Sequence, residues 1–128
     1  MSGNKTPEEV LDSVTEGINA GDLDSLMTLC EPDARFASQP GHLVKNPDGI
    51  RESLRSFIDM NGKLDLNVKR VLRANNLTLV TTEWSFDATD SDGKPVHMTA
   101  KSADVLRQQP DGIWRFALDN PWEQNNPL

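Results

Sequence analysis

Hydrophobic residues recur at two different spacings along this chain, and the spacing changes near residue 63. In the first part, apolar residues return every three or four positions over several segments, as they do on the buried face of a helix. In the second part they alternate with polar residues, for example Leu64, Leu66 and Val68 with Asp65 and Asn67, as in a strand with one buried face. The pattern predicts helices followed by a sheet.

The predicted helices carry clear start and stop signals. The segment Thr6-Pro7-Glu8-Glu9 is a capping box with proline at the first helical position, and Asn46-Pro47 repeats the cap-then-proline arrangement. Gly21 suits the left-handed conformation that ends a helix, and Asp22 can cap a short second helix that stops before Pro32. The expected helices cover residues 7–20, 23–31 and 47–60.

Turn residues divide the rest of the chain into strands. Asp92-Gly93 is typical of a tight hairpin turn, and Gln109-Pro110-Asp111-Gly112 marks another turn. The expected strands cover residues 33–38, 64–72, 77–89, 95–108 and 113–120, with an irregular segment at 42–45 and a polar tail at 122–128. Three helices packed on one side of a curved antiparallel sheet make an α+β fold, and one domain accounts for residues 1–128.

Composition and charge narrow the classes of partner. The formal net charge of −7 argues against binding to nucleic acid or to an anionic membrane surface, since both need a basic face. Cys30 is the single cysteine, so no intrachain disulfide can form, and no Cys/His spacing indicates a metal site. The sequence has no apolar leader and no run of about 18 apolar residues, so we expect a cytoplasmic protein.

Five short phrases follow one another at regular places in the chain. They are Gly21-Asp22-Leu23-Asp24-Ser25-Leu26, Glu31-Pro32-Asp33-Ala34, Gly49-Ile50-Arg51-Glu52-Ser53-Leu54, Asp104-Val105-Leu106-Arg107 and Asp111-Gly112-Ile113-Trp114-Arg115-Phe116. Their order resembles the nuclear transport factor 2-like superfamily, and within it the bacterial ketosteroid isomerase-like or SnoaL-like branch. The resemblance implies a cystatin-like cone, in which the helices and the curved sheet enclose a pocket for a small molecule.

The resemblance allows a test against one known mechanism. Ketosteroid isomerase moves a proton with a carboxylate base and stabilises the new oxyanion with a tyrosine and a protonated aspartic acid. This chain contains no tyrosine, and the position of the base falls on Ser38, with Gln39 next to it. The position of the protonated acid matches Asp104. We therefore expect a protein that is not a standard steroid isomerase.

Two carboxylates form the candidate catalytic site. If the second turn pairs Gln108 with Ile113, Asp104 and Asp119 become diagonal neighbours on one face of the sheet. The resemblance places that face inside the cone. Two carboxylates in a partly apolar cavity have separated pKa values, so one serves as acid and the other as base, without a cofactor or a metal. The residues expected to bind the ligand beside them are Ser38, Gln39, Trp84, Met98 and Ser102.

Other interpretations of these residues remain open from the sequence. Asp104 can instead form an ion pair with Arg115, and Asp119 can accept hydrogen bonds from backbone amides in the following turn. Direct pairing through the first hairpin turn points Glu83 into the pocket, whereas a bulge points Trp84 there. We favour Trp84, because an aromatic ring suits an apolar ligand and an unpaired buried carboxylate is costly.

The outward face of the last two strands is predicted to be apolar and to need a cover. The residues expected on this face are Ala103, Val105, Trp114, Phe116 and Leu118. A second copy of the chain is the simplest cover, and homodimers that pair through this sheet face are common in the resembled superfamily. The expected partners are therefore a small-molecule ligand and a second copy of the chain.

The sequence leaves open whether the chain is an enzyme. One hypothesis is an acid/base isomerase, cyclase or hydrolase that acts on a small apolar substrate through Asp104 and Asp119. The alternative is a non-catalytic ligand-binding module, or a structural dimerisation module. His42 and His97 are expected to lie in solvent rather than in the site.

Overall fold

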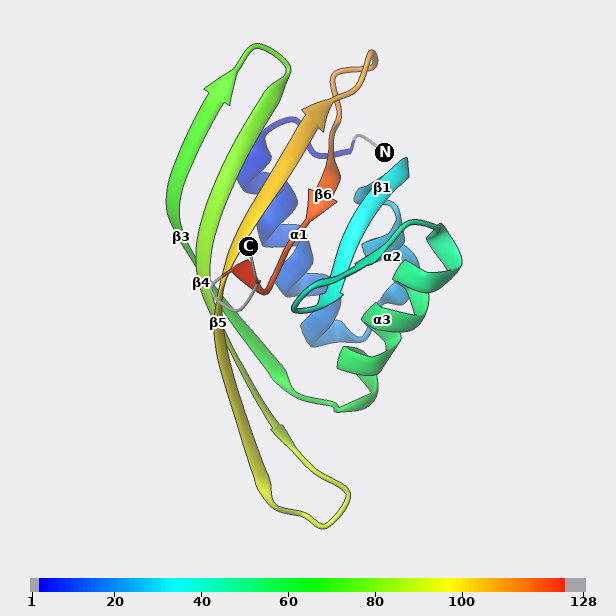
Figure 1. Cartoon of the computed structure of the whole chain (residues 1–128), viewed down its shortest axis with the longest axis vertical. Coiled ribbons are helices and arrows are strands. Elements are labelled where there is room, and N and C mark those ends of the chain that lie inside the picture. The colour runs from blue at the N-terminus through cyan, green and yellow to red at the C-terminus, as the bar shows by residue number, and fades with distance from the viewer. Residues whose placement is uncertain (1–2, 124–128) are drawn as a thin grey trace.

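Three helices lie against a six-stranded curved sheet in the computed structural model, which describes residues 3–123 (Figure 1). The helices are α1 (Pro7–Ala20), α2 (Leu23–Met27) and α3 (Pro47–Asp59). The strands are β1 (Cys30–Gln39), β2 (His42–Val44), β3 (Lys63–Ala74), β4 (Leu77–Thr89), β5 (Pro95–Gln108) and β6 (Trp114–Asp119). The α+β class is confirmed, and the predicted tail beyond residue 123 lies outside the described residues.

The sheet is mixed rather than wholly antiparallel. Its strand order is β2-β1-β6-β5-β4-β3, and β1 pairs in parallel with β6 while the other neighbours are antiparallel. The expectation of a purely antiparallel sheet was wrong at this pair, because α3 leads the chain from the β2 edge to β3 at the opposite edge, and the following strands then bring β6 back beside β1 in the same direction. The segment expected to be irregular at 42–45 forms the short edge strand β2 (His42–Val44).

The caps read from the sequence hold α1 and α3 in place. The Thr6 hydroxyl accepts a hydrogen bond from the Glu9 backbone N–H at 3.1 Å, and the Glu9 carboxylate accepts one from the Thr6 N–H at 3.0 Å. Gly21 ends α1 with a φ of 69°, in the left-handed region that glycine adopts at little cost. Asn46 caps α3 by accepting from the Gly49 N–H at 2.7 Å. Both caps therefore behave as predicted.

The hairpin between β4 and β5 sets which residues face the helices. Thr89 pairs with Pro95, so the loop holds residues 90–94 instead of a two-residue turn. This longer loop shifts the register by one residue, so that Trp84 pairs with Ala100 on the inner face and Glu83 faces outward. The ladder from β4 to β5 is regular, so the loop length, rather than the bulge we had invoked, turns Trp84 inward.

A bulge between β5 and β6 changes the register a second time. Leu106 pairs with Phe116 but Val105 pairs with Leu118, which leaves Ala117 as the extra residue. Trp114 and Phe116 are 1% and 3% exposed and lie in the core. The prediction that these two rings face outward was therefore wrong, because Gln108 pairs with Trp114 and the turn is one residue longer than assumed.

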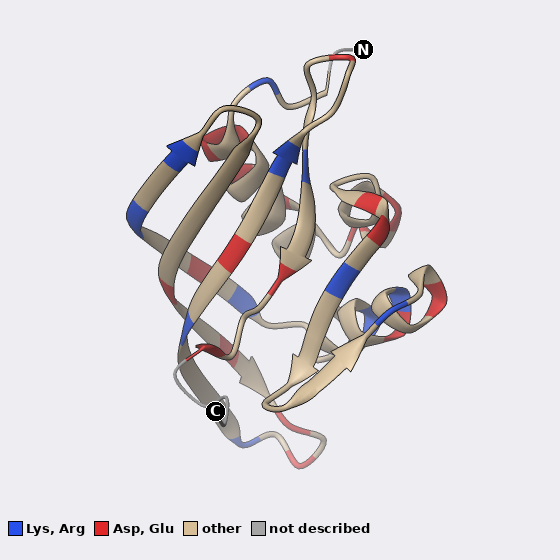
Figure 2. Ribbon diagram, turned by 45° about the horizontal axis from the view of Figure 1, so that its top comes forward, with Lys and Arg blue, Asp and Glu red and all other residues tan. Residues whose placement is uncertain are grey.

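The core lies between the inner face of the sheet and the three helices. Its most deeply buried side chains come from α1, β4, β5 and β6, and they include Val10, Val80, Phe86, Leu106 and Trp114. Charged positions are found on the loops, the helices and several strands, and acidic positions interrupt the central strands β5 and β6 (Figure 2). These acidic positions in the middle of the sheet lead to the candidate site.

Candidate functional site

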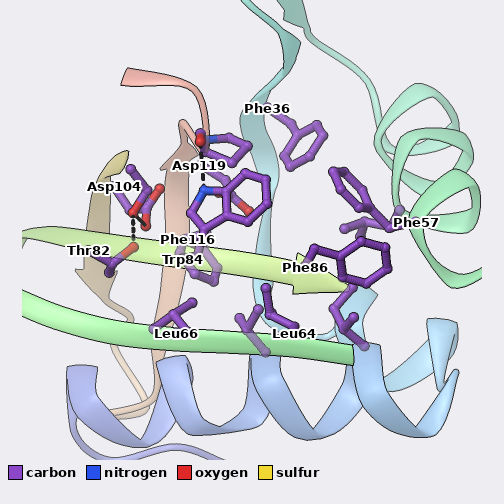
Figure 3. A pocket seen from close by; sticks show the side chains of 15 residues that line it. Phe36, Phe57, Leu64, Leu66, Thr82, Trp84, Phe86, Asp104, Phe116 and Asp119 are labelled. Carbon is purple, nitrogen blue, oxygen red and sulfur yellow. Dashed lines mark hydrogen bonds between the residues drawn. The ribbon is translucent and has the colours of Figure 1, made fainter. Parts of the chain in front are cut away.

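An apolar cavity of about 80 Å³ lies between the inner face of the sheet and the helices (Figure 3). Its walls are formed mainly by aliphatic and aromatic side chains from α1, α3, β1, β3 and β4. Hydroxyl and carboxyl groups reach it from four lining residues, which are Thr82, Ser102, Asp104 and Asp119. The polar groups therefore gather where β4, β5 and β6 meet, and the rest of the wall is apolar.

Asp104 is held by hydrogen-bond donors although it is only 4% exposed. The Asn120 backbone N–H donates to Oδ1 at 2.8 Å, and the Ser102 hydroxyl donates to Oδ2 at 3.2 Å. Because the Ser102 hydrogen is used in this way, the Thr82 hydroxyl, 2.5 Å from the Ser102 oxygen, must donate to it. This chain of donors favours the charged form of Asp104.

Burial acts against those donors. It raises the pKa of Asp104 to about 6, while the hydrogen bonds from Asn120, Asp119 and Ser102 limit the rise. Asp104 is therefore mostly a carboxylate at neutral pH, and it regains its proton in mildly acidic solution.

Asp119 is the member of the pair that holds its proton more strongly. The bulge at Ala117 brings it to the inner face beside Asp104, and the two carboxyls are hydrogen-bonded to each other. Burial raises the pKa of Asp119 well above its ordinary value, and the charge of Asp104 raises it further. One carboxylate and one carboxylic acid thus share the polar end of the cavity, so the pair can both accept and donate a proton.

The alternative partners considered for these two residues lie elsewhere. The Arg115 guanidinium donates to the Thr28 carbonyl, and within residues 3–123 no ion pair involves Asp104 or Asp119. The backbone amide of the following turn donates to Asp104 rather than to Asp119. The carboxyl pair therefore has no cationic side chain to balance it in this part of the chain.

Aromatic rings form much of the apolar wall of the cavity. The Trp84 indole N–H donates to the Pro121 carbonyl at 2.8 Å, which fixes the ring beside the carboxyl pair. Trp122 packs edge-on against Trp84 at 5.2 Å and stacks on Phe57 at 6.3 Å between ring centroids. Its own indole N–H donates to the Ser38 carbonyl at 3.2 Å. The chain after β6 therefore anchors this aromatic wall.

The structure brings some of the predicted site residues together and leaves others apart. Asp104, Asp119, Trp84 and Ser102 line the cavity. Met98 packs against the core beside Phe86, outside the lining. The remaining predicted residues, Ser38 and Gln39, also lie outside the lining, where their strand contributes Phe36 instead.

Sequence reasoning missed several lining residues. The inward position of Thr82 follows once the length of the β4–β5 loop is known, and that of Phe57 follows from the helical spacing of apolar residues in α3. Both positions could therefore have been predicted from the sequence. His42 and His97 are exposed, and His97 forms an ion pair with Asp87 away from the cavity.

The described residues contain neither a cluster of metal ligands nor a membrane-spanning helix. Within residues 3–123, no three His, Cys, Asp or Glu side chains gather closely enough to hold a metal ion. No helix in that range has the length and hydropathy needed to cross a bilayer.

Comparison with known proteins identifies the family of this chain. A family model described as a SnoaL-like domain matches residues 11–116. The chain belongs to the SnoaL-like domain family. A search of curated proteins finds no match.

Solved structures share the architecture of this SnoaL-like chain at low sequence identity. A putative calcium/calmodulin-dependent protein kinase type II association domain from Thiobacillus denitrificans is 16% identical, covers 94% of this chain and 96% of its own, and has a TM-score of 0.77. A ketosteroid isomerase-like protein from Erwinia carotovora atroseptica is 15% identical, with 88% of each chain covered and a TM-score of 0.76. A nuclear transport factor 2-like protein from Salmonella enterica is 19% identical, covers 88% of this chain and 84% of its own, and has a TM-score of 0.74. At these identities the likenesses show the fold alone.

Proposed function

We propose that this SnoaL-like protein binds a small, largely apolar molecule in the cavity and transfers a proton on it. Asp104 is the base and Asp119 is the acid. The observation that carries this proposal is a pair of carboxyls, Asp104 and Asp119, side by side at the polar end of an otherwise apolar cavity, where burial raises the pKa of both. An isomerase, a cyclase or a hydrolase can each use such a pair.

The position of the pKa values supports the role of each carboxyl. A base works best when its pKa lies close to the working pH, and the pKa of Asp104 is about 6. The raised pKa of Asp119 keeps a proton available for a ligand oxygen or nitrogen. Hydrogen bonds from Asn120 and Ser102 hold Asp104 in the protein by itself, so the base is already oriented before a ligand enters.

The volume of the cavity limits the size of the ligand. Pockets for drug-sized molecules usually measure roughly 300–1,000 Å³, whereas this cavity measures about 80 Å³. It therefore suits a ligand of a few heavy atoms. A larger ligand would have to displace side chains of the lining, such as the ring of Phe57, which packs on Trp122. Together with the absence of tyrosine from the sequence, this size argues against a standard steroid isomerase.

Proton transfer can be tested with a small ketone in heavy water. We expect the protein to exchange the hydrogens next to the carbonyl of 2-butanone for deuterium, as followed by proton NMR. Asp104→Asn should lower the exchange rate about a hundredfold or more, since a general base contributes roughly that much. Asp12→Asn, at an exposed position of α1, is the matched control and should leave the rate unchanged. Exchange at the same rate in Asp104→Asn would refute the assignment of the base.

We also propose a homodimer that forms through the outer face of the sheet. Four apolar side chains, one from each of β3, β4, β5 and β6, lie directly opposite one another in a row: Leu72, Leu79, Val105 and Leu118. Leu72 is 52% exposed and Leu79 is 38% exposed in the single chain. A row of this kind spanning four strands needs a cover, and a second copy would bury roughly 1,200–2,000 Å² in total.

Light scattering at several protein concentrations tests the dimer. Leu79→Lys should give a monomer, because it places a charge in the middle of the row. Leu43→Lys is the matched control, since Leu43 is 45% exposed but lies on the edge strand β2. A wild-type protein that is monomeric at every concentration would remove this proposal.

A further inference from the structure

No cationic side chain lies beside the carboxyl pair in the described lining of the cavity, and this feature indicates which class of ligand fits the site. A buried carboxylate usually lies beside a cationic side chain, because hydrogen bonds alone offset only part of its desolvation. Here the described lining of the cavity contains no lysine, arginine or histidine. The donors to Asp104 are three neutral groups, the Asn120 N–H, the Ser102 hydroxyl and the Asp119 carboxyl. The cavity is the side from which a cationic group of a ligand can reach the pair.

The aromatic wall favours the same kind of ligand. Trp84, Phe57 and Phe86 line the cavity, and Phe57 meets both of the other rings edge-on. Aromatic faces carry negative electrostatic potential and attract alkylammonium groups, most strongly where water is excluded. The Trp84 N–H is occupied by the Pro121 carbonyl, so this indole offers the ligand its apolar surface and not its donor.

We infer that the cavity binds a small molecule that carries one protonated amine, with the ammonium group against Asp104 and Asp119 and the carbon chain against the aromatic wall. This inference rests on the proposed function and names the substrate class of the same site. One carboxylate and one ammonium make the occupied site neutral. A carboxylate or phosphate ligand would instead place a second negative charge beside Asp104, with no positive charge in the described lining to offset it.

The groups that face the pair predict how binding changes with pH. The lining residues of α1, α3, β3 and β4 are aliphatic, aromatic or hydroxyl side chains, which do not titrate near neutral pH. On β1, Cys30 lies within electrostatic reach of Asp119, but burial raises the pKa of this thiol to about 12 and it stays neutral. On β6, the Arg115 guanidinium is bound to the Thr28 carbonyl. Protonation of Asp104 therefore governs the charge of the site in mildly acidic solution.

Three probes of nearly equal shape test the inference: isobutylamine, isobutanol and isobutyrate. Their binding can be followed by NMR through the indole N–H of Trp84, which lines the cavity. Trp114 is the internal reference, because it is buried in the core and lies outside the lining. We expect isobutylamine to bind at least about tenfold more tightly than isobutanol near pH 7.5, and isobutyrate to leave the Trp84 signal unmoved.

The pH and the variants sharpen the test. The preference for the amine should shrink towards about pH 5, where Asp104 is protonated. Asp104→Asn should remove the preference and retain the binding of isobutanol, while Asp12→Asn should change neither. If isobutanol binds wild type as tightly as isobutylamine, the inference is overturned. The pH series in the wild-type protein gives the same decision if Asp104→Asn does not fold.

The outcomes also separate this inference from the proposed function. Deuterium exchange on 2-butanone without a preference for the amine would overturn the inference and leave proton transfer intact. A preference for the amine without exchange on any carbon acid would support the inference and overturn the catalytic role. A Trp84 signal that none of the probes moves would overturn the amine inference, and the exchange experiment would then decide the proposed function alone.

Discussion

The two faces of the sheet carry apolar side chains from the same strands but differ in what covers them. On β5, Leu106 faces inward and is fully buried under the helices, whereas its neighbour Val105 faces outward in the row with Leu79 and Leu118. The inner face also holds Asp104 and a cavity, while on the outer face Leu72 and Leu79 are exposed in the single chain. The comparison teaches that one alternating pattern can supply both a core with a site and a surface suited to association.

The largest expected effect is a difference in the free energy of unfolding between a substitution on the inner face and one on the outer face. Trp114→Ala should lower the free energy of unfolding by about 3–5 kcal/mol, because the ring is 1% exposed and its loss leaves a cavity. Leu72→Ala removes a side chain that is 52% exposed and should cost less than about 1 kcal/mol in the monomer. Urea denaturation measures both. Equal losses from the two variants would contradict the distinction between the faces.

The second effect concerns the charge on the inner face. In the folded protein Asp104 keeps its proton up to about pH 6, but in the unfolded chain it loses the proton near its ordinary pKa of 3.8. The folded state therefore binds more protons between these values, and the free energy of unfolding falls as pH rises through this window. For Asp104 the loss amounts to about 3 kcal/mol.

Asp104→Asn isolates this contribution. The difference in unfolding free energy between wild type and Asp104→Asn should change by about that amount between about pH 3 and neutral pH, across the two pKa values, in favour of the variant at neutral pH. Asp12→Asn, on the exposed side of α1, serves as the control and should follow the wild-type curve. A constant difference across the window would show that Asp104 titrates at its ordinary pKa.

A smaller effect comes from the helix that covers the inner face. Thr6→Ala removes the cap of α1 and should cost about 1 kcal/mol, because the Glu9 N–H loses its partner. Thr6→Ser keeps the hydroxyl and should restore most of the stability. Thermal unfolding measures both variants, and a loss of similar size in Thr6→Ser would argue against the cap as the cause.

The smallest effect is expected on the outer face beside the cavity wall. Lys69 and Glu83 form an ion pair at 3.6 Å, and both side chains are about half exposed. Glu83→Gln should therefore change the free energy of unfolding by less than about 0.5 kcal/mol. Its inward neighbour gives the contrast, because Trp84→Leu should cost about 2 kcal/mol or more through lost packing and a Pro121 carbonyl without its donor.

The sequence predicted the elements well because their signals are local. The capping box at Thr6 and the left-handed Gly21 place α1 within a residue, and the strand bounds of β4 and β5 match the expected ones. Such signals depend on neighbours along the chain, so no tertiary information is needed to read them.

The sequence predicted facing directions less well because a register depends on single residues in turns. Five loop residues between Thr89 and Pro95 reverse the faces expected from a two-residue turn. The longer turn before Trp114 buries that ring, and the bulge at Ala117 then brings Asp119 to the inner face. From the sequence we also expected Asp119 on the inner face, but that expectation assumed that Gln108 pairs with Ile113, and the strands do not adopt that register. A bulge leaves no clear mark in the sequence, so these facing directions needed the structure.

The parallel pairing of β1 with β6 also sets the order in which the protein can be completed. Phe36, from an early strand, has Asp119 as its partner, so the sheet cannot close until nearly all of the described chain has left the ribosome. Until then the edge of β1 that will receive β6 is open to other strands, which is a hazard for aggregation. The carboxyl pair is assembled in the same late event, because Asp119 arrives with the strand that closes the sheet.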